Sequence, residues 1–433
     1  MESNSQKYHG EWWIPAESNN NNRSIFPIPK GMEKRCVGTL TYREKGNATL
    51  ELYHIPSDYN SRLYKYNGVM WGRDANGHIF TLFNVEMSSF QLSDFTNTTF
   101  VVGYILLGEH VLSMDDACFN RCIVQFPHLR NWAFYNNLNL KIKDEAYLYT
   151  LKKNDKGDYL IEQEVEEGVK WILRDSYSQH LERFSMTITQ TTEFVVEVLQ
   201  SVSIHYFLRQ ITEFSQFLSI ALYGKQAPSS IQLMNKGNKG QATLLFTKKE
   251  SVEPLNLMKL IKFDELKDKI PSMLSVWHQN FEKVSPISKY LVDSLCESKT
   301  FDVPDFLIIA QALDGYHKRF VNKKNGKDNR KYEEQIDILL KQFEDVEAIQ
   351  MSNLNPVVVK DSRHKYSHLY PDDEKPDAVD GIELYWLTEK CKILLICCIL
   401  NMLGLTNDEI NICCKKSPID YMIKSNPFEF EAQ

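Results

Sequence analysis

The sequence predicts an α+β protein in which an N-terminal antiparallel β-rich domain precedes a C-terminal all-α helical bundle. From residue 34 to about residue 200, short runs of β-branched and aromatic residues are separated by turn signals, a texture typical of antiparallel strands. After residue 255 the apolar residues recur at spacings of three and four, the period of an amphipathic helix. This change of period divides the chain into a strand-forming part and a helix-forming part.

The strand-forming part contains one clear hairpin and one long helix. Asn76-Gly77 favours a tight turn over residues 73–78, because both residues tolerate positive φ. Residues 201–224 carry a continuous apolar stripe and end at a glycine, which predicts an amphipathic helix. Two short strand-like segments follow before the polar stretch 247–254. The first domain is therefore placed at residues 1–254, mainly β up to about residue 200.

The second domain, residues 255–433, is predicted to be a bundle of helices. Its clearest apolar stripe lies in residues 331–350, where the hydrophobic side chains share one helical face. The expected helices span residues 263–280, 286–298, 304–321, 331–350, 361–370, 381–403 and 407–415.

Composition and charge exclude several classes of protein. With 43% hydrophobic and 25% charged residues, the 433-residue chain resembles folded soluble proteins and not disordered or collagen-like ones. A net charge of −7 provides no global positive field for coating nucleic acid. The longest apolar run, Ile393 to Leu400, is far shorter than the about 20 residues that span a bilayer. Nine irregularly spaced cysteines and a start without a secretory pattern predict a cytoplasmic protein with no membrane partner.

Residues 357–373, VVVKDSRHKYSHLYPDD, concentrate the reactive side chains of the bundle. Asp361 or Ser362 can N-cap a helix here, which would place Arg363 in the first turn and His368 further along. The free N–H groups and the positive dipole of a helix start favour a phosphate. Arginine adds a permanently charged planar fork, and histidine titrates near neutral pH and can move a proton. This combination suits phosphodiester chemistry.

An arginine followed by a histidine at this spacing is not rare. Chance predicts about one pair with four to six intervening residues, and the chain has four. They are Arg73 with His78, Arg121 with His128, Arg174 with His180, and Arg363 with His368. Only the last pair lies in a capped helix inside the predicted bundle, and this context selects it.

The segment RHKYSH, from Arg363 to His368, resembles the motif of HEPN ribonucleases, an arginine and a histidine separated by four to six residues. FLIIAQALDGYHKRF, residues 306–320, is similar to an early helix of the Apea-like branch of that family. GEWWIP at residues 10–15 and VGTLTY at residues 37–42 are similar to the associated Apea N-terminal domain. The resemblance covers most of the chain and implies an anti-phage abortive-infection protein that acts as an endoribonuclease.

The resemblance also implies site residues and a mechanism. Arg363 and His368 would be catalytic, with His368 as general acid or base and Arg363 stabilising the phosphorane. The ribose 2′-hydroxyl would attack the neighbouring phosphorus without a metal or cofactor, leaving a 2′,3′-cyclic phosphate and a 5′-hydroxyl. Auxiliary positions would be His364, where many relatives have Asn, and Asp314, where many have Glu. Tyr370 resembles a tyrosine that partner proteins nucleotidylate in HEPN toxins.

Helix geometry and the resemblance together predict a homodimer. Five positions along a helix turn through about 500°, which leaves Arg363 and His368 roughly 140° apart around the axis. One chain would then supply half a site, and the resemblance implies that two HEPN bundles pair isologously. The expected substrate is RNA, such as a tRNA or another single-stranded loop whose ribose and phosphate can rotate. The N-terminal domain is expected to sense or regulate, and a phage-derived trigger fits that role.

A second candidate surface is the basic segment KRFVNKKNGKDNRK, residues 318–331. Its cations either belong to a solvated loop or contact RNA. They are Lys318, Arg319, Lys323, Lys324, Lys327, Arg330 and Lys331.

The candidate residues also have structural interpretations. Asp314 could orient His368 or bridge to Arg319, and His368 could be a hydrogen-bonded histidine of the bundle. Arg363 could form a salt bridge with one of the neighbouring carboxylates Asp361, Asp372 and Asp373.

Two other functions fit the same residues. The chain could be a non-catalytic module that binds RNA or a phage protein through the basic segment. Alternatively, His364 and His368, at positions i and i+4, could bind a metal with nearby carboxylates, as in a metal-dependent phosphohydrolase.

Overall fold

The structure is a computed structural model that describes residues 5–15, 35–43, 48–53, 67–90, 97–133, 138–143, 146–151, 159–183, 185–235, 241–246, 258–295, 303–322 and 330–425. The chain forms two compact units, each made of several stretches of sequence. The first consists of Met1–Pro127, Gly168–Ile211 and Ala227–Ser251, and the second of His128–Glu167, Thr212–Gln226 and Val252–Gln433. Within the described ranges, no helix has both the length and the apolar character needed to cross a bilayer.

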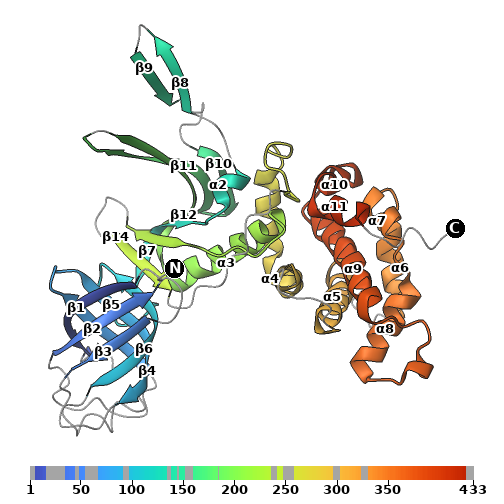
Figure 1. The fold of residues 1–433 in the computed structure, drawn as a ribbon, viewed down its shortest axis with the longest axis horizontal. Coiled ribbons are helices and arrows are strands. Elements are labelled where there is room, and N and C mark those ends of the chain that lie inside the picture. Colours follow the sequence, from blue (N-terminus) through green and yellow to red (C-terminus); the bar gives the residue numbers. More distant parts are fainter. Residues whose placement is uncertain are drawn as a thin grey trace. The chain divides into compact units, whose positions relative to one another are not determined.

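The first unit is built from antiparallel strands in the order β11-β12-β7-β13-β14-β6-β3-β2-β1-β4-β5 (Figure 1). An additional pairing between β5 and β6 closes the last six of these strands into a barrel. The predicted antiparallel β-rich domain is thereby confirmed. The strands are β1 Ser5–Trp13, β2 Cys36–Arg43, β3 Ala48–Leu52, β4 Asn67–Asp74, β5 Ile79–Phe90, β6 Thr98–Leu107, β7 Cys118–Gln125, β11 Val169–Leu181, β12 Met186–Ser203, β13 Ser230–Met234 and β14 Gln241–Phe246.

The interior of the barrel is filled by alternate side chains of these strands. Trp12, Leu40, Phe80 and Phe100 are fully buried there, since successive residues of a strand point to opposite faces. Gly72 lies so close to the Trp12 ring that a Cβ at this position would be 2.1 Å from a ring carbon. A residue larger than glycine at position 72 would therefore displace the central tryptophan.

The hairpin predicted at residues 73–78 is present, but its turn differs from the expected one. Strands β4 and β5 pair across it, and Gly77 has a φ of 87°. Asn76 does not share the positive φ that the prediction required. Instead, the Asp74 carboxylate accepts hydrogen bonds from the backbone N–H groups of Asn76 and His78, at 3.0 and 2.8 Å. The hydrogen bonds to the Asp74 side chain thus stabilise the turn without a positive φ at Asn76.

Helix α3, Ile204–Ala221, begins directly after β12 and confirms the helix predicted at residues 201–224. Its apolar stripe, which includes Phe207, Ile211, Phe214 and Leu218, is buried. Strands β13 and β14 follow the helix and correspond to the two strand-like segments expected there.

The second unit contains the C-terminal helical bundle, which confirms the predicted all-α part of the fold (Figure 1). Helix α9 is buried along most of its length and packs against α4, α5, α6, α7 and α10. The bundle helices are α4 Ile270–Ser294, α5 Val303–Tyr316, α6 Tyr332–Gln342, α7 Glu347–Ser352, α8 Pro356–His368, α9 Gly381–Met402, α10 Asn407–Cys414 and α11 Pro418–Lys424. A π-helical turn η2, His317–Val321, continues α5, and a 3₁₀ turn η3, Asp372–Glu374, follows α8.

The second unit also includes three strands and a short helix. Strand β10 packs against α4, and β8 pairs with β9. These elements are α2 Leu129–Trp132, β8 Leu138–Lys143, β9 Ala146–Leu151 and β10 Tyr159–Glu166.

Several helix boundaries differ from the predicted ones. The helices expected at 263–280 and 286–298 form one helix, α4, with Pro286 inside it. Trp277, Phe281, Ile287 and Leu291 are buried on both sides of the proline, so packing offsets the hydrogen bond that proline cannot make. The helix expected at 331–350 is two helices, α6 and α7, with a turn between them, and α11 was not predicted.

Candidate active site

Helix α8 carries the arginine and histidine of the predicted site, and it is longer than expected. The Asn355 side chain caps its start by accepting a hydrogen bond from the backbone N–H of Val357, at 2.9 Å. Pro356 occupies the first helical position, where its missing N–H costs nothing. The helix ends at His368, because Leu369 adopts the left-handed conformation with a φ of 55°.

The cap predicted at Asp361 or Ser362 is therefore wrong. Arg363 is the eighth residue of α8 and lies two turns beyond the helix start. The unpaired N–H groups of a helix belong to its first turn, so they are not beside Arg363. Any phosphate at this position must be held by side chains.

Arg363 is partly buried, with 23% of its side chain exposed. Its guanidinium carbon lies over the ring of Tyr332 at 4.4 Å from the centroid. Its Nη2 atom lies 3.5 Å from Oδ2 of Asp314, an ion pair at the long limit of a hydrogen bond. The guanidinium is thus in contact with a ring on one face and a carboxylate at one edge.

Asp314 lies near the end of α5, and 7% of its side chain is exposed. Its Oδ2 atom accepts a hydrogen bond from Nζ of Lys318 at 2.9 Å, in addition to the longer contact with Arg363. Asp314 thus pairs with Lys318 and Arg363, and not with His368 or Arg319 as considered from the sequence. Arg319 instead donates to the backbone oxygen of Lys283 at 2.7 Å. The structure therefore joins the two predicted site residues Asp314 and Arg363.

The histidines of α8 are near one another but differ in burial. The ring centroids of His364 and His368 are 6.2 Å apart, and that of Tyr370 is 5.7 Å from His368. His368 is exposed, whereas His364 is half-buried. Burial lowers the pKa of His364, and the positive charges of Lys375 and Arg363 lower it further. His364 is therefore neutral at pH 7, and His368 is the histidine that faces solvent.

Arg363 and His368 do not converge within one chain. Both belong to the same regular helix, so five positions separate them by about 140° around its axis and about 7.5 Å along it. The groups that surround Arg363 come from α5 and α6, whereas His368 is next to the connection that follows α8.

The connection between α8 and α9, residues 369–380, is hydrogen-bonded to side chains of α8. The Tyr366 hydroxyl donates to the backbone oxygen of Val379 at 2.9 Å, and the Val379 N–H donates to the Ser362 hydroxyl oxygen at 3.1 Å. The ammonium group of Lys375 lies over the Tyr370 ring at 5.4 Å. These contacts fix the segment that carries Tyr370 next to His368.

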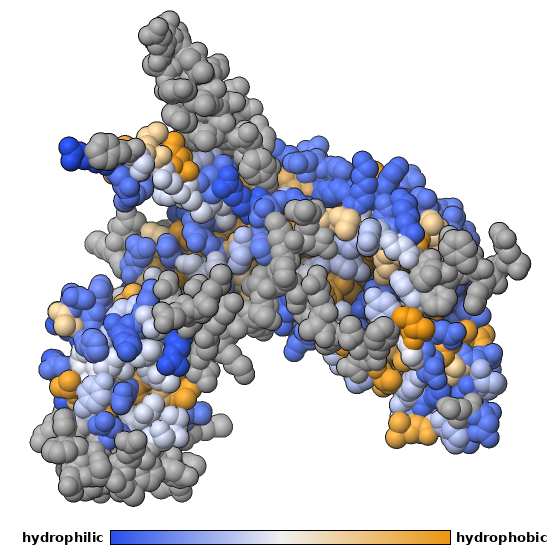
Figure 2. Space-filling view, in the orientation of Figure 1, coloured by the Kyte–Doolittle hydropathy of each residue, from blue (hydrophilic) through white to orange (hydrophobic). Residues whose placement is uncertain are grey.

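Apolar side chains are exposed at both ends of α8 and at the start of α9. Figure 2 shows apolar residues at the surface of this part of the bundle. Leu369 is 85% exposed and Ile382 is 48% exposed. Val357 and Tyr370 are also exposed large hydrophobic residues.

The basic segment lies partly outside the described residues. Lys323, Lys324 and Lys327 belong to the undescribed part. Among the others, Lys318 pairs with Asp314, Arg319 contacts Lys283, and Nη1 of Arg330 lies 3.4 Å from Nε2 of His317. Lys331 is exposed directly before α6.

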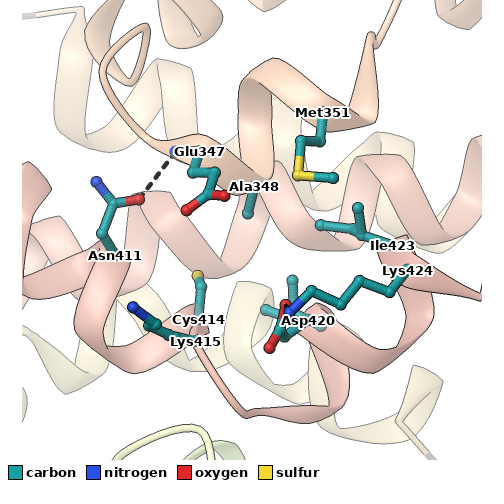
Figure 3. Close-up of a pocket in the computed structure, with 10 residues that line it drawn as sticks. Glu347, Ala348, Met351, Asn411, Cys414, Lys415, Asp420, Ile423 and Lys424 are labelled. Atoms are coloured by element: carbon teal, nitrogen blue, oxygen red, sulfur yellow. Dashed lines mark hydrogen bonds and ion pairs between the residues drawn. The ribbon is translucent and has the colours of Figure 1, made fainter.

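In the part of the chain that the structure describes, no group of three or more His, Cys, Asp or Glu side chains is placed to hold a metal ion. A pocket of about 110 Å³ opens between α7, α10 and α11 (Figure 3). Glu347, Asn411, Cys414 and Asp420 are among its lining residues, and none of the predicted site residues is.

The cysteines near the end of the chain are buried thiols on helices α9 and α10. Burial raises the pKa of Cys391 and of Cys413 to about 12. The buried set is Cys391, Cys397, Cys398, Cys413 and Cys414.

Sequence reasoning missed the contribution of Tyr332. The tyrosine lies at the start of α6, and 31 positions separate it from the arginine that it contacts. No spacing rule links two residues so distant in the chain. The only available signal was an aromatic residue at the start of a predicted helix, which usually indicates core packing.

Models of known protein families match both the N-terminal and the C-terminal part of the chain. The family model of ApeA N-terminal domain 1 matches residues 7–277, which is more than half of the chain. The model of the Apea-like HEPN domain matches residues 307–409, which include most of α5 and all of α6 and α8. No curated protein and no solved structure matches the chain. HEPN domains suggest a ribonuclease-type role, here in an ApeA-like anti-phage protein. The resemblance inferred from the sequence is confirmed, and the chain belongs to the family that joins an ApeA N-terminal domain to an Apea-like HEPN domain.

Proposed function

We propose that the protein is a metal-independent endoribonuclease of anti-phage defence and that its active site is built on α8. One observation carries this proposal. Helix α8 of the HEPN domain holds a partly buried arginine between an aromatic ring and a carboxylate, with a solvent-facing histidine at its end. A fixed cation and an exposed titratable group are what phosphodiester cleavage requires.

The proposed reaction uses the RNA strand itself as the source of the nucleophile. The ribose 2′-hydroxyl attacks the adjacent phosphorus, and the bond to the leaving 5′-oxygen breaks. His368 removes the proton from the 2′-hydroxyl or donates one to the leaving oxygen. Arg363 stabilises the added negative charge on the phosphorane. The products are a 2′,3′-cyclic phosphate and a 5′-hydroxyl, and no cofactor takes part.

Two copies of the chain form the complete site in this proposal. Arg363 and His368 are about 140° apart around one helix, so one phosphate contacts both more easily when each comes from a different copy. The exposed apolar residues at the ends of α8 and the start of α9 suit such a symmetric contact. The remaining auxiliary residues are His364 and Tyr370 beside His368.

A single-stranded RNA loop, such as a tRNA loop, is the proposed substrate. Its ribose and phosphate can rotate into line for attack, whereas a regular duplex holds them out of line. The proposed setting is the bacterial cytoplasm, with a phage-derived trigger acting through the N-terminal domain.

The decisive experiment is RNA cleavage in excess EDTA. His368→Ala should lower the rate by roughly 10²- to 10⁴-fold, because general acid–base catalysis is lost. Arg363→Ala should lower it by roughly 10²- to 10³-fold, because charge stabilisation is lost. His180→Ala is the matched control, since His180 is an exposed histidine that follows Arg174 at a similar spacing on β11. It should cut at the wild-type rate.

The same variants separate the alternatives. Undiminished cleavage by His368→Ala would overturn the assignment of that residue. Full protection against phage by the double variant would instead indicate a non-catalytic module that binds RNA or a phage protein. Loss of wild-type activity in EDTA, with recovery on adding a divalent metal, would indicate a metal-dependent phosphohydrolase.

A further inference from the structure

The guanidinium of Arg363 packs against a buried aromatic ring that belongs to no sequence motif. Tyr332 is 7% exposed, and the guanidinium carbon lies 4.4 Å from the centroid of its ring. The tyrosine hydroxyl donates a hydrogen bond to the backbone oxygen of Ala310 at 2.9 Å. The ring is therefore fixed at one end by the backbone of α6 and at the other end by α5.

The same turn of α5 also fixes an edge of the guanidinium. Asp314 lies four residues after Ala310, so both face the same side of α5. Its carboxylate is 3.5 Å from Nη2 of Arg363 and 2.9 Å from Nζ of Lys318. Because Lys318 is the nearer cation, the buried carboxylate stays paired if Arg363 turns toward a phosphate.

A second contact holds α6 in register with α8. Glu333 follows Tyr332, and its Oε2 atom accepts from Nζ of Lys360 at 2.8 Å. Lys360 and Arg363 are three residues apart and lie on the same face of α8. The start of α6 is thus attached to α8 at two neighbouring points, one ionic and one aromatic.

We infer that Tyr332 is a positioning residue for Arg363, which sets the plane of the guanidinium so that its outer N–H groups face a phosphate. The inference rests on the proposed function. An arginine side chain has several rotatable bonds, and its planar fork binds phosphate well only in one orientation. A ring against one face removes rotational freedom and excludes water there, which strengthens the attraction between the cation and the reacting phosphate.

The alternative is that Tyr332 only fills the core of the bundle. The two roles differ in which part of the side chain matters. Core filling depends on volume, and phenylalanine and leucine both lose the hydroxyl bond to Ala310, so the two substitutions would then have similar effects. Positioning depends on the aromatic face, so phenylalanine would replace tyrosine and leucine would not.

The first test measures cleavage kinetics of three variants of the whole 433-residue chain. Tyr332→Phe should keep kcat within about threefold of wild type, because the ring face remains. Tyr332→Leu should lower kcat by roughly 5- to 30-fold with little change in KM, because the contact acts on charge that develops during the reaction. Tyr316→Leu is the matched control: Tyr316 is also a buried tyrosine, with its hydroxyl donating to the Cys398 backbone at 2.7 Å. It should lose a similar amount of thermal stability while kcat stays within about threefold.

The second test needs no nuclease activity. Phenylglyoxal modifies exposed guanidinium groups, and mass spectrometry gives the modification rate at Arg363. The rate should rise several-fold in Tyr332→Leu and stay at the wild-type value in Tyr332→Phe and Tyr316→Leu.

Two results would overturn the inference: wild-type kcat and modification rate in Tyr332→Leu, or equal losses in Tyr332→Phe and Tyr332→Leu. If Arg363→Ala and His368→Ala cut RNA normally, the proposed function fails, and the modification rates still decide whether Tyr332 holds the arginine.

Discussion

His278 lies between two carboxylates in the second unit. Its Nδ1 atom is 2.7 Å from Oε2 of Glu213, and its Nε2 atom is 3.4 Å from Oε2 of Glu166. Burial alone would lower the pKa of His278, but the hydrogen bonds and charges of Glu213 and Glu166 raise it above its ordinary value. The Glu213 side chain is fully buried, so the charged histidine compensates a carboxylate that water does not reach.

This arrangement predicts that the stability contributed by His278 depends on pH. Because the folded-state pKa is raised, the contribution is complete below the unfolded value of about 6.5 and is lost as pH rises through the folded value. His278→Gln should therefore lower the melting temperature by roughly 2–4 °C more at pH 6 than at pH 9. Thermal unfolding at both pH values measures the difference. His180→Gln, at an exposed histidine, should show no such difference, and an equal loss at both pH values for His278→Gln would contradict the prediction.

At the scale of single residues, the sequence predicted which residues belong to the candidate site better than it predicted what they contact. Arg363, His368 and Asp314 were selected by spacing and by resemblance to a family, and the structure brings Asp314 to Arg363. The partner of Asp314 was not predicted, because it depends on how α5 packs against α8. Tyr332 could not be found either, since its role arises from a contact between helices and not from a local pattern.

Among the elements of the bundle, α8 is joined by side-chain hydrogen bonds to the connection that follows it. Ser362 and Tyr366 hold the backbone of Val379 from two sides, one as acceptor and the other as donor. Ser362 is fully buried, so its hydroxyl cannot be replaced there by water. The segment beside His368 is therefore anchored by two hydrogen bonds of α8.

Breaking this anchor should destabilise the protein. Ser362→Ala should cost about 1–3 kcal/mol, because the Val379 N–H loses its acceptor in a partly buried place. Tyr366→Phe should cost about 1 kcal/mol, the usual net value of one hydrogen bond. Chemical denaturation measures both. Ser367→Ala is the control, since Ser367 is an exposed neighbour on the same helix, and its effect should stay within about 0.5 kcal/mol. Losses from Ser362→Ala no larger than those of the control would show that the connection is not anchored as described.

At the scale of elements, the spacing of hydrophobic residues predicted that helices are present better than it predicted where they begin and end. The apolar stripe of residues 331–350 stays buried on both sides of a turn, because Phe343 and Val346 fill the core where the helix is interrupted. A continuous stripe therefore does not guarantee a continuous helix. The start of α8 was misplaced for a different reason: Asp361 and Ser362 are good capping residues, yet Asn355 with Pro356 lies earlier and provides the cap.

For the whole molecule, the division into a β-rich and a helical part was predictable because the two periods differ along the chain. The sequence did not predict which stretches of the chain make up each of the two compact units. Strand β7 pairs with β12 and with β13, which follow it by more than 60 and 100 residues. Such pairings depend on the fold as a whole and have no local signal. The domain boundary expected at residue 254 stays a prediction.

The proposed composite site makes a prediction about assembly. A heterodimer of one Arg363→Ala chain and one His368→Ala chain keeps one intact pair, an arginine from one copy and a histidine from the other. Purified through two different tags, it should recover roughly half of the wild-type cleavage rate, although each parental homodimer is inactive. RNA cleavage by the three purified dimers checks this. A heterodimer as inactive as its parents would show that each site uses residues of a single chain.

Burial protects the thiols of α9 and α10 from oxidation as long as the protein is folded. A thiol reacts through its thiolate, and burial keeps Cys391 and Cys413 protonated at physiological pH. Once heat or denaturant opens the bundle, these two thiols regain ordinary acidity, and oxygen can oxidise them to disulfides with other chains. Thermal inactivation in air should therefore be irreversible, and refolding should succeed only when a reductant is present.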